Sequence, residues 1–216
     1  MQNFKQQFEQ NKQGWIRSFT SGLSQDEDGN FLPWMSYPAI NFLQQNLKDS
    51  DLIFEFGCGA STLFFSDRVK YVTSLETNQL WFNIIKGKLN KFLINKNNEC
   101  KIPKDLIDKI DDVFFYDKGV VLLMKNGQFN ELYQKILLYF NQGYDYIVID
   151  SLKRFDCVYN SINSLSKNGS IILDDSQRKS YHKIFSFLAR QEFKKADFWG
   201  IAPGQIKIKN TTFFKK

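Results

Sequence analysis

Residues 53–67 read IFEFGCGASTLFFSD, and two glycines, Gly57 and Gly59, stand between the two apolar runs of this stretch. The first run has the length of a short buried strand, and the second suits a helix. A dinucleotide-binding loop of the form G-x-G-x-x-G has a third glycine, but the corresponding residue here is Thr62. The stretch therefore predicts a strand, a tight loop and a helix, with a loop that departs from the dinucleotide pattern.

Apolar runs of strand length alternate with segments of helical periodicity from residue 38 onward. This alternation predicts a doubly wound α/β sheet. We expect strands at 51–56, 69–76, 144–150, 170–176, 194–200 and 207–214, and a hairpin made of 111–116 and 120–125. We expect helices from Pro38, over 62–69 with Ser61 as the N-cap, over 78–93, from Asn130 to residue 140, over 155–167, and over 181–188.

Two of these helices are expected from their apolar spacing. Leu80, Ile84 and Ile85 fall on one face of the helix over 78–93. The helix after residue 150 has apolar residues at spacings of three, four and three, and Asn168 and Gly169 are expected to end it; the apolar residues are Phe155, Val158, Ile162 and Leu165.

The length and composition indicate one folded domain. The chain has 216 residues, 43% of them hydrophobic and 16% aromatic, which is far from the composition of disordered chains. The first thirty residues contain no apolar core of a signal peptide, and no run of eighteen apolar residues occurs. Three widely spaced cysteines suit a reducing compartment, so we expect a soluble, cytoplasmic protein without a membrane segment. The sequence does not indicate an oligomeric state.

The net charge of +6 is concentrated near the C-terminus. Residues 178–216 contain ten Lys or Arg against two acidic residues, which gives +8 and leaves −2 for the other 177 residues. Such a surface suits an anionic substrate or nucleic acid. A solvated helix followed by a lysine-rich segment explains the same charge. Because no basic-aromatic nucleic-acid motif accompanies the charge, we expect that nucleic acid is not the partner.

Acidic residues follow several of the predicted strands. Ligands of doubly wound sheets lie beyond the carboxyl ends of the strands. Glu76 ends the second strand, where a carboxylate can accept hydrogen bonds from the ribose hydroxyls of an adenosine. Glu55 lies just before Gly57, where its charge would repel a pyrophosphate but suits the ammonium and sulfonium groups of S-adenosylmethionine. Two alternative explanations remain. Gly57 and Gly59 could make only a tight turn, and Glu76 could be an acid that stabilises the N-terminus of the next helix.

Four segments, EFGCGAST, SLETN, YDYIVIDS and GSIILDD, occur in the order and spacing of the Rossmann-like (class I) S-adenosylmethionine-dependent methyltransferases. The chain resembles this family over residues 33–215. The resemblance implies a mostly parallel, seven-stranded sheet with NTTFFKK as an antiparallel final strand. We expect a helical extension at 1–32 before a methyltransferase domain at 33–216, and these cofactor-binding residues: Trp34, Tyr37, Glu55, Gly57, Gly59, Ser61, Thr62, Glu76 and Asp150.

Trp34 and Tyr37 belong to the segment LPWMSYPAI, residues 32–40, which resembles a segment that covers the cofactor in related methyltransferases. Their rings could stack on the adenine or close over the acceptor. Packing in the core is the alternative for both rings.

Asp150 and Lys153 have the D-x-x-K spacing of the catechol-type O-methyltransferases, which the chain also resembles in part. In that family an Asp-Asn pair follows the fifth strand, and here Asp175 and Ser176 occupy those positions. The resemblance implies Asp150 and Asp175 as ligands of a Mg²⁺ ion and Lys153 as the base, giving Asp150, Lys153 and Asp175 as catalytic residues. Ser176 departs from the pattern. The alternatives are that Asp174 and Asp175 cap the next helix and that Lys153 is a surface lysine.

These features predict an S-adenosylmethionine-dependent methyltransferase with a small-molecule or glycan acceptor, methylated on a hydroxyl. A non-catalytic module that binds the same cofactor is the alternative from another class. A nicotinamide-dependent oxidoreductase is disfavoured by Thr62 in the loop and by the lack of a Tyr-x-x-x-Lys pair after the fourth strand. The identity of the acceptor is not encoded in any motif of the chain.

Overall fold

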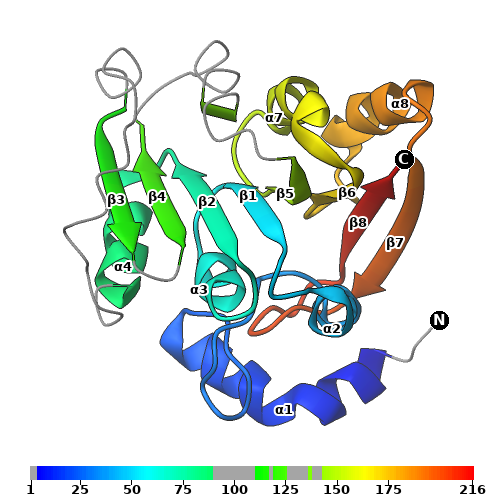
Figure 1. Ribbon diagram of the computed structural model, residues 1–216. Helices are drawn as coiled ribbons and strands as arrows, with labels where there is room; N and C mark the ends of the chain where they lie inside the picture. The colour runs from blue at the N-terminus through cyan, green and yellow to red at the C-terminus, as the bar shows by residue number, and fades with distance from the viewer. Residues whose placement is uncertain (1–3, 90–109, 117–118, 126–135, 138–142) are drawn as a thin grey trace.

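The computed structural model describes residues 4–89, 110–116, 119–125, 136–137 and 143–216. Its centre is a sheet of eight strands in the order β3-β4-β2-β1-β5-β6-β8-β7, with helices on both faces (Figure 1). The strands are β1 Leu52–Phe56, β2 Tyr71–Glu76, β3 Asp112–Tyr116, β4 Val120–Met124, β5 Tyr144–Ile149, β6 Leu165–Leu173, β7 Lys194–Gly200 and β8 Lys209–Lys215. The doubly wound α/β prediction is confirmed.

The middle of the sheet is parallel and its two edges are antiparallel. Parallel pairs join β4 to β2, β2 to β1, β1 to β5, and β5 to β6. β8 runs antiparallel to both β6 and β7, as expected for the final strand. The predicted hairpin is confirmed, with β3 antiparallel to β4. β3 is thus an eighth, outer strand beyond the seven that the family resemblance implies.

Helices cover the two faces of this sheet. They are α1 Phe4–Ser21, α2 Tyr37–Asn46, α3 Ala60–Ser66, α4 Gln79–Leu89, α7 Arg154–Ser161 and α8 His182–Arg190, with short 3₁₀ turns at Ile162–Ser164 and Lys179–Tyr181. Buried side chains of α7 and α8 pack on one face, and those of α2 and α3 pack on the other. In Figure 1, α1 lies beyond α2 and α3, outside the second layer. No helix among the described residues is long and apolar enough to span a membrane.

α1 is fastened to the sheet by polar contacts from its buried side. The Gln7 side chain accepts a hydrogen bond from the backbone N–H of Ile201 (3.1 Å), and the Trp15 indole donates to the carbonyl of Gln205 (3.1 Å). Phe8 and Trp15 also pack against the core beneath α2. The helix predicted in the N-terminal segment is present, whereas the division of the chain at residues 32/33 stays a prediction.

Three predicted helix details are wrong. α3 begins at Ala60 after Gly59, so Ser61 is inside the helix and is not its N-cap. On α4 the buried residues are Phe82, Ile85 and Leu89, whereas Leu80 is 73% exposed. The helix predicted to run to Asn168 ends at Ser161, because Leu165 already pairs with Tyr144 as part of the sheet. The helix predicted from Asn130 lies mostly outside the described residues.

Candidate functional site

A cavity of about 510 Å³ opens at the carboxyl ends of β1, β2 and β5. The strand order reverses here, because β1 is followed by β2 on one side and by β5 on the other. Of the residues predicted for the site, six line this cavity: Trp34, Gly59, Ser61, Glu76, Asp150 and Lys153. The other five, Tyr37, Glu55, Gly57, Thr62 and Asp175, are not among the residues that line it.

Gly57 makes the turn out of β1 and must be a glycine. Its φ of +98° is unfavourable for residues with a side chain. A Cβ at this position would lie 2.3 Å from the carbonyl oxygen of Asp150. The turn is fixed by a hydrogen bond from Gly57 N to Leu75 O (2.8 Å) and by one from Asp150 N to Phe56 O (2.9 Å). Gly57 therefore lets the loop after β1 approach the end of β5, which forms one wall of the cavity.

Thr62 caps the helix that leaves the loop. Its Oγ1 accepts a hydrogen bond from Gly59 N (3.1 Å) and donates one to Glu55 Oε2 (2.7 Å). Ser74 Oγ donates to the same carboxylate oxygen (2.6 Å). The position of the absent third glycine is thus used for a fully buried bridge between the loop and an acid on β1. Such a bridge needs a hydroxyl, which glycine lacks.

Glu55 lies beneath the loop and has no exposed surface. Burial raises the pKa of its carboxyl to about 7, against the opposing effect of the hydroxyl donors. Its other oxygen, Oε1, has no hydrogen-bond partner among the described residues. Glu55 therefore supports the loop from below and is not part of the cavity surface.

Glu76 is at the cavity, where three backbone amides hold its carboxylate. Oε2 accepts from Cys58 N (2.9 Å), and Oε1 accepts from the N–H groups of Thr77 and Asn78 (2.7 Å each). The same carboxylate lines the cavity, so it is placed where a ligand can reach it. The amides fix the carboxylate between the loop after β1 and the two residues that precede α4.

Two tryptophans form the wall on the α4 side of the cavity. The rings of Trp34 and Trp81 are stacked, with centroids 6.0 Å apart. The Trp81 indole donates to Cys58 O (2.5 Å), and the Trp34 indole donates to Pro203 O (2.9 Å). Trp81 was not among the predicted site residues, although it lies only five residues after Glu76, near the start of α4. Tyr37 is only 3% exposed and packs in the core, as the alternative explanation expected.

Asp150 is paired with Arg154 rather than with Lys153. Arg154 Nη2 lies 2.6 Å from Asp150 Oδ1, and its other nitrogens donate to the carbonyls of Ser151 and Asp174. Lys153 lines the cavity with a φ of +52°, in the left-handed region that residues with a Cβ seldom adopt. The spacing of Asp150 and Arg154 at i and i+4 is a signal in the sequence that the prediction missed.

Asp174 and Asp175 meet a buried lysine from β8. Lys209 Nζ lies 2.5 Å from Asp174 Oδ2 and 3.0 Å from Asp175 Oδ1, and it donates to the carbonyl of Trp34 (2.7 Å). Burial raises the pKa of Asp174 to about 6, whereas the neighbouring carboxylates raise the pKa of Lys209. No local pattern links Lys209 to Asp174, because 35 residues separate them. Asp175 also pairs with Arg178.

The pairing of these acids does not fit the predicted Mg²⁺ site. Asp150 and Asp175 each already have a cationic partner, and Ser176 Oγ is hydrogen bonded to Thr212 Oγ1 (2.7 Å). Within the described ranges, no group of three or more His, Cys, Asp or Glu side chains could hold a metal ion. The helix-cap alternative is also not observed, since α8 begins after Tyr181 and neither Asp174 nor Asp175 caps it.

No protein-family model and no curated protein matches this chain, but many solved structures share its fold. A caffeoyl-CoA O-methyltransferase candidate from Staphylococcus aureus aligns over 99% of this chain and 97% of its own, with 15% identity and a TM-score of 0.56. A methyltransferase candidate from Streptococcus mutans, in complex with SAH, aligns over 82% and 94%, with 15% identity and a TM-score of 0.52.

An rRNA methylase from Streptococcus thermophilus aligns over 83% of this chain and 95% of its own, with 9% identity and a TM-score of 0.53. Identities this low show the architecture alone. The sheet order, the antiparallel β8 and these similarities together show that the chain has the Rossmann-like fold of the class I S-adenosylmethionine-dependent methyltransferases.

Proposed function

We propose that this protein is an S-adenosylmethionine-dependent methyltransferase whose cofactor binds in the cavity beside the loop 57–60. The observation that carries this proposal is Glu76, whose carboxylate three amides hold at the end of β2, where it lines the cavity. That position suits a ribose hydroxyl. The 510 Å³ cavity is within the usual range for sites of such ligands.

The residues around the cavity suit the two ends of this cofactor. The Trp34 and Trp81 rings offer apolar surface for the adenine, next to Glu76. The Asp150 carboxylate, 46% exposed, offers a negative charge toward the cationic end. When bound, the cofactor supplies an electrophilic methyl group. Gly57 keeps the loop close to β5, so that both ends are served by one continuous cavity.

The acceptor is proposed to be a hydroxyl of a small molecule or glycan, bound on the Asp150–Arg178 side of the cavity. Methyl transfer needs the acceptor oxygen within about 3.5 Å of the methyl group and a group that takes its proton. Lys153 lines this side and is the proposed base. Arg154 pairs with Asp150 and also donates to the Asp174 carbonyl, so its proposed role is to position the Asp150 carboxylate.

Calorimetry with S-adenosylmethionine and S-adenosylhomocysteine tests the cofactor site. We expect Glu76→Ala to weaken binding by about 1–3 kcal/mol, because a charge-assisted hydrogen bond is lost. Glu9→Ala, on the exposed side of α1, is the matched control and should bind as the wild type does. Preferential binding of NAD, or equal affinity of Glu76→Ala and wild type, would contradict the proposal.

Turnover of an identified acceptor tests the proposed base. We expect Lys153→Met to lower kcat by a factor of about 10² or more with unchanged cofactor affinity, because a base acts on the acceptor and not on the adenosine. A chelator should leave the rate unchanged, since arginine and lysine already balance the carboxylates. Loss of activity to the chelator and recovery with Mg²⁺ would favour the metal-dependent mechanism of the catechol enzymes. If the protein methylated RNA and no small molecule, the proposed acceptor class would be wrong, but the proposed cofactor site would be unaffected.

A further inference from the structure

A second groove, of about 380 Å³, lies on the α2 side of the sheet and shares no lining residue with the cofactor cavity. Its base is formed by side chains on one face of the sheet: Tyr146 of β5, Ser170 of β6, Phe213 of β8 and Ala196 of β7. Phe42 and Asn46 of α2 form one wall. Ser170 and Ala196 are small, so the sheet surface is hollow between the aromatic rings.

The aromatic side of the groove is held rigidly. The ring of Phe42 packs against the rings of Phe198 and Phe213, with both centroid distances at 5.0 Å. Phe198 and Phe213 also contact each other at 5.0 Å. A flat apolar group can lie on such a surface without reordering it, which lowers the entropic cost of binding.

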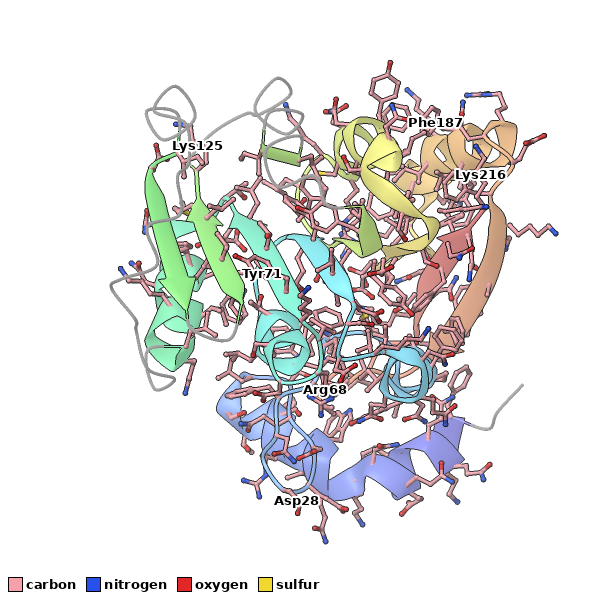
Figure 2. All side chains as sticks on the ribbon, viewed as in Figure 1. Asp28, Arg68, Tyr71, Lys125, Phe187 and Lys216 are labelled. Carbon is pink, nitrogen blue, oxygen red and sulfur yellow. The ribbon has the colours of Figure 1, made fainter. Side chains whose placement is uncertain are left out.

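The rim of the groove carries positive charge. Lys194 and Lys215 are directly opposite each other in the β7–β8 pair, and both line the groove. Like charges in this position are destabilising. In the described part of the chain neither lysine has an ion-pair partner, and no residue lining the groove is acidic. Two further lysines line the groove: Lys216, labelled in Figure 2 at the end of β8, and Lys195, which is paired with Asp197.

We propose that this groove binds a small anion that carries an aromatic or similarly flat apolar group. The apolar group would lie over Ala196 and Ser170 against Phe42, Tyr146 and Phe213. The anionic group, a carboxylate, sulfonate or phosphate, would lie between Lys194 and Lys215 and relieve their repulsion. Lys194 and Lys215 belong to the basic segment 178–216, so part of its positive charge would bind this anion and not the ligands of the methyl-transfer site.

The probe for this proposal is 1-anilinonaphthalene-8-sulfonate, an aromatic sulfonate that fluoresces in apolar surroundings. We expect saturable binding of one probe per chain that S-adenosylhomocysteine does not displace. Lys194→Gln/Lys215→Gln should weaken it by about tenfold or more, because two charged donors are lost. Lys12→Gln/Lys70→Gln, two exposed lysines elsewhere, makes the same change in net charge and should leave the affinity within about twofold of wild type.

Ala196→Trp, which fills the hollow base, should abolish probe binding while S-adenosylhomocysteine binding, measured by calorimetry, stays unchanged. Circular dichroism melting confirms that each variant is folded, and the lysine pair decides the outcome if Ala196→Trp is not. Displacement of the probe by S-adenosylhomocysteine would assign the signal to the cofactor cavity and overturn the proposal. Equal affinities of the two double-lysine variants would also overturn it. If the protein binds the probe but not the cofactor, the proposed function is refuted and the proposal for this groove still holds.

Discussion

Two carboxylates, Glu55 and Asp174, are buried on either side of β5, and the protein stabilises them in different ways. Glu55 on β1 has 0% exposure and receives hydrogen bonds from the neutral hydroxyls of Thr62 and Ser74. Asp174, just after β6, has 2% exposure and contacts the ammonium group of Lys209 at 2.5 Å. Hydroxyls leave the cost of burying a charge largely in place, whereas a direct cation offsets it.

This difference matches the positions of the two acids. Glu55 lies under the loop 57–60, where a fixed cation would compete with a cationic cofactor. Asp174 lies under the strand ends nearest the proposed acceptor, and its network continues through the Asp174 carbonyl to Arg154 and Asp150. Lys209 also donates to the Trp34 carbonyl, so one buried lysine connects the tryptophan wall to the acids of the acceptor side.

The largest expected effect follows from removing the cation. Lys209→Met leaves Asp174 buried without its partner, and we expect the free energy of unfolding at pH 8 to fall by about 3–5 kcal/mol. Urea denaturation measures it. At pH 5 the loss should be smaller, because Asp174 can then be protonated.

The double variant Lys209→Met/Asp174→Asn is the control for this prediction. It removes both charges, so we expect it to recover a large part of the lost stability, as a coupled pair does in a double-mutant cycle. Additive losses in the double variant would show that Lys209 stabilises the fold through its methylene chain, Trp34 or Asp175, and not through Asp174.

The next effect concerns the acid that lacks a cation. Burial raises the pKa of Glu55 from 4.5 to about 7, so the folded protein binds a proton that the unfolded chain releases between these values. This contribution to stability is complete below pH 4.5 and is lost as the pH rises through 7. Its size is on the order of 3 kcal/mol.

Glu55→Gln removes this contribution to the pH dependence. We expect the unfolding free energy of the wild type to fall between pH 5 and pH 8 by roughly 3 kcal/mol more than that of the variant. Urea titrations at the two pH values measure the difference. Glu9→Gln, on the exposed side of α1, should follow the wild type. Parallel pH profiles for Glu55→Gln and wild type would mean that the hydroxyls of Thr62 and Ser74 hold Glu55 ionised throughout.

The sequence predicted what depends on local pattern. The strands, the hairpin and the loop at Gly57 follow from apolar runs and from glycine, and each is confirmed. The end of α7 was mispredicted because Leu165 continues a helical spacing, while pairing with Tyr144 decides its conformation. Lys209 was missed because its partners come from distant segments of the chain. In composition it is one of many lysines, and only the folded chain shows that it is 4% exposed.

Thr62 shows how a correct observation can have a different cause. The absent third glycine was interpreted as evidence about the ligand, and the structure gives the position a structural reason, since the Thr62 hydroxyl joins Gly59 to Glu55.

We therefore expect Thr62→Val, which has nearly the same shape, to lower the free energy of unfolding by about 1–3 kcal/mol at pH 8, because the buried Glu55 carboxylate and the Gly59 amide each lose a hydrogen-bond partner. At pH 5 the cost should be smaller, because a protonated Glu55 needs fewer donors. Urea denaturation of Thr62→Val and Thr62→Ser separates the two roles of the side chain. Thr62→Ser keeps the hydroxyl and should retain most of the stability at both pH values. A loss in Thr62→Ser as large as that in Thr62→Val would mean that the methyl group, and not the bridge to Glu55, is what this position requires.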